Sequence, residues 1–175
     1  MIRVLGGEYK GKKLNNFKLE SLRPTKAIVR KSIMDTLMPF ENKKILDLFS
    51  GVGTLGIETL SRGAKSVCFV DNNPQAIKIL KKNINMFDSK CNIDIKLSDV
   101  FIFLKKNKLK FDVVFADPPY YKYNFNDLVK LIKPILINDG VFCYESNKFS
   151  NQKSENIKIK KYGATQVIFW RKNER

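Results

Sequence analysis

Between residues 45 and 145 the sequence alternates short apolar segments with segments of helical periodicity, and this alternation restricts the fold more than any other feature. The expected strands are residues 45–48, 67–70, 93–97, 111–116 and 141–145. The expected helices between them are residues 54–61, 74–86, 100–106 and 126–132. Repeated strand–helix units of this kind form a mostly parallel sheet with helices on both faces. The pattern therefore predicts an α/β fold.

The segments on either side of this alternation predict further elements. Residues 2–5 form an apolar strand pattern, and a turn rich in Gly and Lys then returns the chain towards Leu14, which indicates a basic β-hairpin. A helix is predicted by an apolar stripe at Val29, Ile33 and Leu37. Near the C-terminus, apolar segments before and after Tyr162-Gly163 predict an antiparallel hairpin.

The chain carries 33 Lys and Arg against 17 Asp and Glu in 175 residues, which is a formal net charge of +16. Such a charge favours a polyanionic partner, nucleic acid above all. Codon drift in an AT-rich genome is an alternative source of surface lysines. The length fits one domain of ordinary size. We expect residues 23–175 to form a single globular unit and residues 1–22 to form a basic arm on it.

Several kinds of chemistry are disfavoured by residues that the sequence lacks. It contains no histidine, which removes Ser-His-Asp and Cys-His catalysis. Its cysteines are widely spaced, which argues against a disulfide framework and a zinc site, so no metal is expected; they are Cys68, Cys91 and Cys143. No apolar run approaches the roughly 20 residues that span a bilayer, and no apolar signal segment is present at the N-terminus. We therefore expect a cytoplasmic protein without a membrane partner.

A glycine-rich loop of the form GxGxxG follows the first strand of the alternation, and Gly51 and Gly53 are its first two glycines. Asp71 ends the next strand, 20 residues after Gly51, where a carboxylate can accept both hydroxyls of a ribose. These features fit a dinucleotide as well as S-adenosylmethionine (SAM). Asp47 lies four residues before Gly51, where a carboxylate suits a methionine ammonium and repels a pyrophosphate. Asp99 follows the third strand and is placed to receive an adenine amine, so the two further acids favour SAM.

The motif Asp117-Pro118-Pro119-Tyr120 directly follows the most apolar strand of the chain. Its two prolines restrict the backbone and remove two N–H donors, so the carbonyls and the Asp117 side chain are held as acceptors. Two acceptors suit an exocyclic amine, because they orient its lone pair towards an electrophilic methyl group and favour the positive charge that develops on nitrogen. Tyr120 is placed to stack on a flipped base. The motif therefore predicts methyl transfer to the amine of a nucleobase.

These motifs resemble those of class I SAM-dependent methyltransferases, and more closely those of the RsmD family of small-subunit rRNA guanine-N2 methyltransferases. The similarity covers nearly the whole chain and includes IRVLGGEYKGKKL, LRPTKAIVRKSIMDTL, LDLFSGVGTLGIETLSRGA, FVDNN, DVVFADPPY and KKYGATQVIFW. The first two of these segments are the family-specific part. The resemblance implies a Rossmann-like class I methyltransferase fold, with a seven-stranded, mostly parallel sheet that ends in the antiparallel hairpin.

The resemblance also implies site residues. SAM is the implied cofactor, and its expected contacts are Asp47, Ser50, Gly51, Gly53, Asp71, Asn72, Asp99 and Val100. The implied catalytic residues, which hold the guanine N2 amine and stack on the base, are Asp117, Pro118, Pro119 and Tyr120. The basic arm and the helix after it are expected to meet rRNA through Lys10, Lys12, Lys13, Arg23, Lys26 and Arg30. A second lysine run, at residues 105–110, precedes the Asp117 strand and is interpreted as a solvated face away from the site.

The predicted function is methyl transfer from SAM to the N2 amine of a guanine in 16S rRNA, by a monomer acting on an assembled or assembling 30S subunit. Other functions stay open at this point. A DNA adenine-N6 methyltransferase can share the Asp-Pro-Pro-Tyr motif, although the connection after Tyr120 is too short for a target-recognition segment. A non-catalytic RNA-binding assembly module is disfavoured by the intact glycines and acids, and an NAD-dependent oxidoreductase by Asp47 and the Asp-Pro-Pro-Tyr motif.

Overall fold

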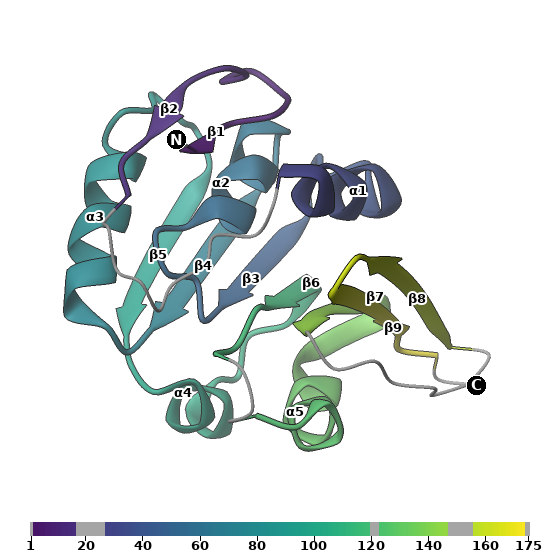
Figure 1. Cartoon of the computed structure of the whole chain (residues 1–175). Helices are drawn as coiled ribbons and strands as arrows, with labels where there is room; N and C mark the ends of the chain where they lie inside the picture. The colour runs from purple at the N-terminus through teal and green to yellow at the C-terminus, as the bar shows by residue number, and fades with distance from the viewer. Residues whose placement is uncertain (1, 17–26, 120–122, 147–155, 174–175) are drawn as a thin grey trace.

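The computed structural model describes residues 2–16, 27–119, 123–146 and 156–173. Its centre is a seven-stranded sheet with the order β5-β4-β3-β6-β7-β9-β8 (Figure 1). The strands are β3 (Lys44–Leu48), β4 (Ser66–Asp71), β5 (Asn92–Leu97), β6 (Phe111–Ala116), β7 (Leu136–Ser146), β8 (Ile157–Tyr162) and β9 (Thr165–Arg171). Strands β3 to β7 are parallel, whereas β9 is antiparallel to both β7 and β8. The predicted sheet with its C-terminal antiparallel hairpin is confirmed.

The strand order reverses beside β3. The chain adds β4 and β5 on one side of β3 and then crosses to add β6 on the other side. Leu48 at the end of β3 pairs with Ala116 at the end of β6, so the segments that follow these two strands start side by side. Ligands of open α/β sheets bind at such a switch point, beyond the carboxyl ends of the strands.

Helices cover both faces of the sheet, and each face has its own apolar core (Figure 1). The helices of the first face are α1 (Ala27–Leu37), α2 (Thr54–Ser61) and α3 (Pro74–Ile84). The helices of the second face are α4 (Val100–Lys106) and α5 (Phe125–Ile132), followed by the short helix η1 (Lys133–Ile135). The strands alternate between the two cores: Val113 and Phe115 pack in the first core, and Val114 packs in the second. The predicted α1 stripe of Val29, Ile33 and Leu37 is buried, as expected.

The N-terminal hairpin consists of β1 (Ile2–Arg3) and β2 (Lys13–Leu14), which pair antiparallel as predicted. Its apolar side chains belong to the first core; they are Ile2, Val4, Tyr9 and Leu14. The backbone N–H of Glu8 donates to the Ser61 carbonyl at 2.7 Å, which joins the hairpin to the end of α2. Gly7 has φ +78° beside this contact, and a Cβ there would stand 1.9 Å from the Ser61 oxygen. Only glycine fits this turn, so the hairpin packs tightly on α2.

The largest difference from the expected elements is in β7, which begins at Leu136 rather than at residue 141. Leu136 pairs with Phe111, and the register between β6 and β7 then shifts before Val113. The residues within this irregularity are exposed, so they carry no apolar alternation that would predict a strand; they are Ile137, Asn138 and Asp139. The strand is extended here by backbone pairing and not by the burial of apolar side chains.

Candidate active site

Each predicted cofactor or catalytic segment follows the end of a parallel strand, so the fold brings them to one edge of the sheet. The glycine-rich loop follows β3, Asp71 ends β4, Asp99 follows β5, and Asp117 follows β6. In the fully parallel part of a sheet the carboxyl ends of all strands lie at the same edge. Tyr120 falls outside the described residues.

The glycine-rich loop is held by the neighbouring strand. Ser50 N–H donates to the Val70 carbonyl at 3.1 Å, and Gly53 N–H returns to the Ser50 carbonyl at 2.8 Å. Gly51 has φ +54°, and a Cβ on it would meet nothing within 4 Å. Gly53 has φ +86°, and a Cβ on it would stand 2.3 Å from Leu80 Cδ1. Gly53 therefore allows α3 to approach, whereas Gly51 presents bare backbone to open space.

Asp71 links the loop to the start of α3. Its Oδ2 accepts the Gly51 N–H at 2.8 Å and its Oδ1 accepts the Asn73 N–H at 2.8 Å. The residue is half-buried, while Asn72 beside it is exposed. A carboxylate oxygen accepts more than one hydrogen bond, so Asp71 keeps capacity for hydroxyl donors while it orders the loop.

Asp47 lies on β3 directly beneath the loop and is 2% exposed. Its Oδ2 accepts the N–H of Gly56, in the first turn of α2, at 2.9 Å. Burial raises the pKa of Asp47 to about 7, the Gly56 hydrogen bond opposes this shift, and the negative charges of Asp117 and Asp71 add to it. The contribution of Asp117 and Asp71 shows that three carboxylates act on one another at this edge.

Asp99 and Val100 begin α4. Asp99 caps the helix, since its Oδ1 accepts the N–H groups of Phe101 and Ile102 at 2.9 and 3.1 Å. The Val100 side chain is 3% exposed and packs in the second core, which leaves its backbone for any cofactor contact. Asp99 is half-buried, so its position beside the site is set by the helix that it caps.

The turn after β6 combines an acid with two prolines. Asp117 is half-buried, Pro118 is buried and Pro119 is exposed. The charge of Asp117 also raises the pKa of Tyr144 on β7, after the larger effect of burial. Burial, together with Glu145 and then Asp117, holds the pKa of Cys143 well above its ordinary value. This edge of the sheet is therefore acidic, which suits a cationic ligand and opposes a pyrophosphate.

The chain matches one family of known proteins over nearly its whole length. The family model described as "Conserved hypothetical protein 95" matches residues 2–171. The chain belongs to this family. It is 37% identical over 126 residues to "Ribosomal RNA small subunit methyltransferase D" of Haemophilus influenzae, a match that covers 69% of this chain and 64% of that protein. It is 34% identical over 153 residues to "Putative rRNA methyltransferase YlbH" of Bacillus subtilis, covering 84% of this chain and 83% of the relative.

A solved structure agrees with the sequence relatives. A putative methyltransferase from Escherichia coli superposes with a TM-score of 0.86 at 25% identity, and the match covers 99% of both chains. The RsmD-type methyltransferase family predicted from the motifs is thus confirmed.

Three aromatic side chains, Phe49, Phe101 and Tyr123, pack together beside the candidate site. The rings of Phe49 and Tyr123 are 4.6 Å apart, and those of Phe101 and Tyr123 are 5.5 Å apart and stacked. The Tyr144 hydroxyl donates to the Tyr123 carbonyl at 3.1 Å, which ties this group to β7. Sequence reasoning missed Phe49 and Phe101, although Phe49 directly follows β3 and Phe101 lies in the first turn of α4. Phe125 does not join this group, because α5 turns its side chain into the second core at 8% exposure.

Asn83 is a third residue that sequence reasoning missed. It is fully buried on α3, where its Nδ2 donates to the Val52 carbonyl at 3.0 Å and to the Asn15 carbonyl at 3.1 Å. Its Oδ1 accepts the Asn15 backbone N–H at 2.7 Å. Asn83 therefore joins the exit of the N-terminal hairpin to the glycine-rich loop. The available signal was a polar residue in the last turn of a helix whose other inward positions are apolar.

The structure corrects the expected role of Arg30 in RNA contact. Arg30 is 3% exposed, because α1 packs its side chain against the hairpin, where Nη2 donates to the Arg3 carbonyl at 3.0 Å. Burial lowers the pKa of Arg30, and the charge of Glu58 opposes this shift. A buried guanidinium cannot meet a phosphate at the surface, so the prediction of Arg30 as an RNA contact is wrong.

The other predicted RNA contacts that the structure describes are exposed, but one of them also makes contacts within the protein. Lys10 and Lys13 are exposed on the hairpin. Lys12 is exposed too, but its Nζ donates to the Met86 carbonyl at 3.2 Å and lies 4.8 Å from the centroid of the Tyr9 ring. Lys12 thus also fastens the hairpin to the end of α3. Arg23 and Lys26 lie outside the described residues.

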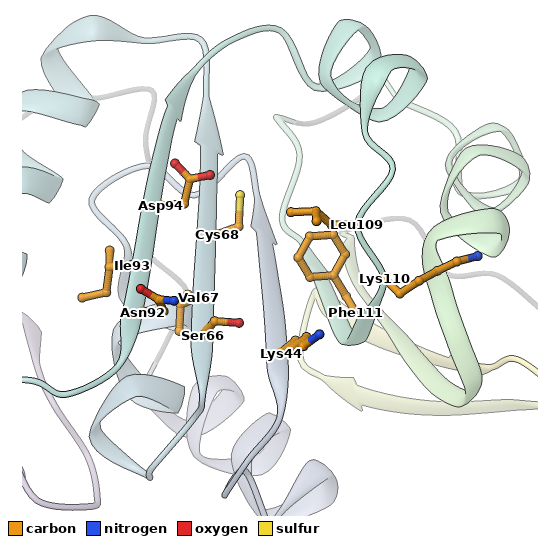
Figure 2. A pocket seen from close by; sticks show the side chains of 10 residues that line it. All are labelled: Lys44, Ser66, Val67, Cys68, Asn92, Ile93, Asp94, Leu109, Lys110 and Phe111. Carbon is orange, nitrogen blue, oxygen red and sulfur yellow. The ribbon is translucent and has the colours of Figure 1, made fainter.

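A hollow of about 330 Å³ lies away from the candidate site (Figure 2). It is lined by the first residues of β3 to β6, among them Lys44, Ser66 and Phe111, and by Lys110. These residues mark the amino ends of the strands, opposite to Asp117. Lys110 at this end agrees with the interpretation of the 105–110 run as a face away from the site. Within the described residues, no cluster of three metal-ligating side chains occurs and no helix is long and apolar enough to cross a membrane.

Proposed function

We propose that the protein transfers a methyl group from SAM to the exocyclic N2 amine of a guanine in 16S rRNA, within an assembled or assembling 30S subunit. The observation that carries this proposal is the position of the Asp117-Pro118-Pro119 turn beside the glycine-rich loop at the topological switch point. Two relatives named as rRNA methyltransferases support the reaction and the nucleic acid. The acidic edge supports a cationic cofactor.

The residues at this edge fit SAM. The open space at Gly51 lets the methionine moiety approach the backbone, and Asp47 supplies a carboxyl group on the strand that leads into the loop. Asp71 would accept the ribose hydroxyls and Asp99 the adenine amine, with Ser50, Gly53, Asn72 and Val100 as the remaining contacts. Bound SAM supplies an electrophilic methyl group on a cationic sulfur.

Asp117 and the Pro118 carbonyl would accept the two N–H groups of the guanine amine. Held in this way, the nitrogen lone pair is directed at the methyl group rather than into the base. The carboxylate would also stabilise the positive charge that develops on nitrogen as the N–CH3 bond forms and the S–CH3 bond breaks. S-adenosylhomocysteine would be the leaving group, and the extra proton on nitrogen would pass to water. Tyr120 would stack on the flipped base.

In the same proposal, residues 1–22 are an RNA-contacting arm, residues 23–175 are the methyltransferase unit, and the protein acts as a monomer. The exposed side chains of Lys10 and Lys13 support the role of the arm. Phosphate contacts of this kind provide affinity and orientation, and the base itself is selected in the site.

The test is transfer of labelled methyl groups. Tritiated SAM is offered with unmethylated small subunits, naked 16S rRNA and plasmid DNA, and the products are digested to nucleosides. The proposal expects N2-methylguanosine from small subunits. Label in N6-methyladenine from DNA would replace it with the adenine methyltransferase, and no label despite measured SAM binding would contradict the rRNA substrate.

The matched variants are Asp117→Ala and Asp127→Ala. Asp127 is an exposed acid on α5 that pairs with Lys130 at 3.3 Å, so its loss changes charge without touching the site. Asp117→Ala should abolish transfer while SAM binding persists, and Asp127→Ala should retain wild-type turnover. Turnover by Asp117→Ala would defeat the role assigned to Asp117.

A further inference from the structure

We infer that the outer face of α3 continues the basic hairpin into one strip that binds the phosphate backbone of the RNA. The strip consists of Lys10, Lys12, Lys13, Lys78, Lys81 and Lys82. This inference rests on the proposed function, because it names a second contact surface for the same RNA.

The lysines of α3 lie on one side of the helix. Lys81 and Lys82 follow Lys78 by three and four residues, a spacing that stacks side chains on a single face. All three are exposed, while the opposite side of α3 packs in the first core through Ile77 and Leu80. The helix contains no acidic residue between Pro74 and Ile84. Its outer face therefore carries positive charge alone.

Some exposed lysines on other helices have an acidic partner on the same helix. Lys31 pairs with Asp35 at 2.6 Å on α1, and Lys130 pairs with Asp127 at 3.3 Å on α5. Within the described residues, no ion pair involves a lysine of α3. Like charges three and four residues apart destabilise a helix. A bound anion would lower this repulsion between the lysines of α3.

The hairpin joins the same surface. Lys12 Nζ contacts the Met86 carbonyl just after α3, and the Tyr9 hydroxyl donates to the Asp88 carbonyl at 2.8 Å. Figure 1 shows β2 beside the end of α3. The helix of 11 residues spans about 16 Å, because each residue adds about 1.5 Å. The helix begins at Pro74, three residues after Asp71, so it leads from the cofactor edge to the hairpin.

The chemistry of the strip favours phosphate over an acidic protein. Lysine is depleted in protein–protein interfaces and is a common ligand of phosphate. The α3 face presents three lysines and no aromatic side chain. This composition suits the phosphate backbone of a nucleic acid, which proteins contact mainly through charge. RNA is the polyanion that the proposed function already places at the neighbouring edge.

The test compares two triple variants with equal loss of charge. One is Lys78→Gln/Lys81→Gln/Lys82→Gln. The control is Lys105→Gln/Lys106→Gln/Lys108→Gln, at exposed positions in and just after α4. Binding of a 16S rRNA fragment is measured between 50 and 200 mM salt, with SAM binding and thermal unfolding measured on the same proteins. Each lost phosphate contact lowers the slope of log K against log salt by about 0.7–0.9.

We expect the slope to fall by about two to three in the α3 variant and to stay at the wild-type value in the control. SAM binding should be unchanged in both. A wild-type slope in the α3 variant, or an equal loss in the control, would overturn the strip. Failure of the wild-type protein to bind or methylate rRNA would instead overturn the proposed function, so the two failures are distinct.

Discussion

Asn83 Nδ2 donates a 3.0 Å hydrogen bond to the Val52 carbonyl, so a fully buried amide on α3 holds the middle of the glycine-rich loop. The same amide group binds the backbone of Asn15 in both directions. A carboxylate at position 83 accepts but does not donate, which leaves the Val52 and Asn15 carbonyls without their donor. The position of the loop thus depends on a residue 31 positions away in the chain.

We predict that Asn83→Asp lowers the free energy of unfolding by about 1–3 kcal/mol, the usual cost of unsatisfied buried polar groups. Because the loop loses its anchor, SAM affinity should fall several-fold. Urea unfolding and calorimetric titration with SAM measure the two effects. Asn85→Asp makes the same change at an exposed position at the end of α3 and should alter neither quantity. Unchanged SAM affinity in a destabilised Asn83→Asp would restrict Asn83 to a structural role.

A second prediction separates backbone strain from cofactor contact at Gly51. Gly51 and Gly163 have φ +54° and +57°, and a Cβ on either would meet nothing within 4 Å. Gly51→Ala and Gly163→Ala should therefore lose similar stability, about 1–2 kcal/mol each. Only Gly51→Ala should weaken SAM binding, because its methyl group enters the space left for the cofactor. Equal SAM affinity in the two variants would remove Gly51 from the cofactor site.

A third prediction concerns pH and Asp47. Its pKa of about 7 in the folded protein exceeds the ordinary 3.8, because the side chain is buried. Between these two values the native state keeps a proton that the unfolded chain releases, so stability falls as pH rises through this window. The fall attributable to Asp47 is on the order of a few kcal/mol.

Asp47→Asn keeps an acceptor for the Gly56 N–H and does not titrate. The variant should lose less stability than wild type between pH 5 and pH 8 in urea unfolding. Asp127→Asn, at an exposed acid, should follow the wild-type curve. Parallel curves for wild type and Asp47→Asn would show that Asp47 is ionised throughout.

A fourth prediction tests the burial of Arg30. Arg30→Met removes the hydrogen bond to the Arg3 carbonyl and one of the two positive charges that act on the buried Glu58. The ion pair of Glu58 with Arg62, at 3.7 Å, remains, so stability should fall by about 1–3 kcal/mol. The salt dependence of RNA binding should stay at the wild-type value. Lys31→Met makes the same charge change at a side chain that is 69% exposed and should leave stability nearly unchanged. A reduced slope of log K against log salt for Arg30→Met would show that Arg30 contacts RNA.

The arrangement of the candidate site was largely predictable because its signals are local. Strand periodicity places Asp71, Asp99 and Asp117 after parallel strands, and parallel strands end at one edge whatever packs around them. The glycines and prolines carry their own backbone restrictions. The family motifs lie in the same turns, so the fold and the family were both accessible from the chain itself.

Burial of individual polar residues was not predictable in this way. Arg30 lies off the apolar stripe of α1 and looks like a surface cation, yet the hairpin and α2 close over it. Phe125 follows a tyrosine-rich segment and looks like part of an aromatic surface, yet α5 turns it into the core. In each case the residues that bury the side chain come from another part of the chain.

The sequence by itself determined the order of elements, the edge where the acids and glycines meet, and the family, because periodicity and turn chemistry act over a few residues. Only the tertiary structure decided that Asn83 supports the loop, that Lys12 fastens the hairpin, and that α3 presents its lysines next to it. Those outcomes depend on which surfaces dock, and docking is set by the summed burial of segments far apart in the chain.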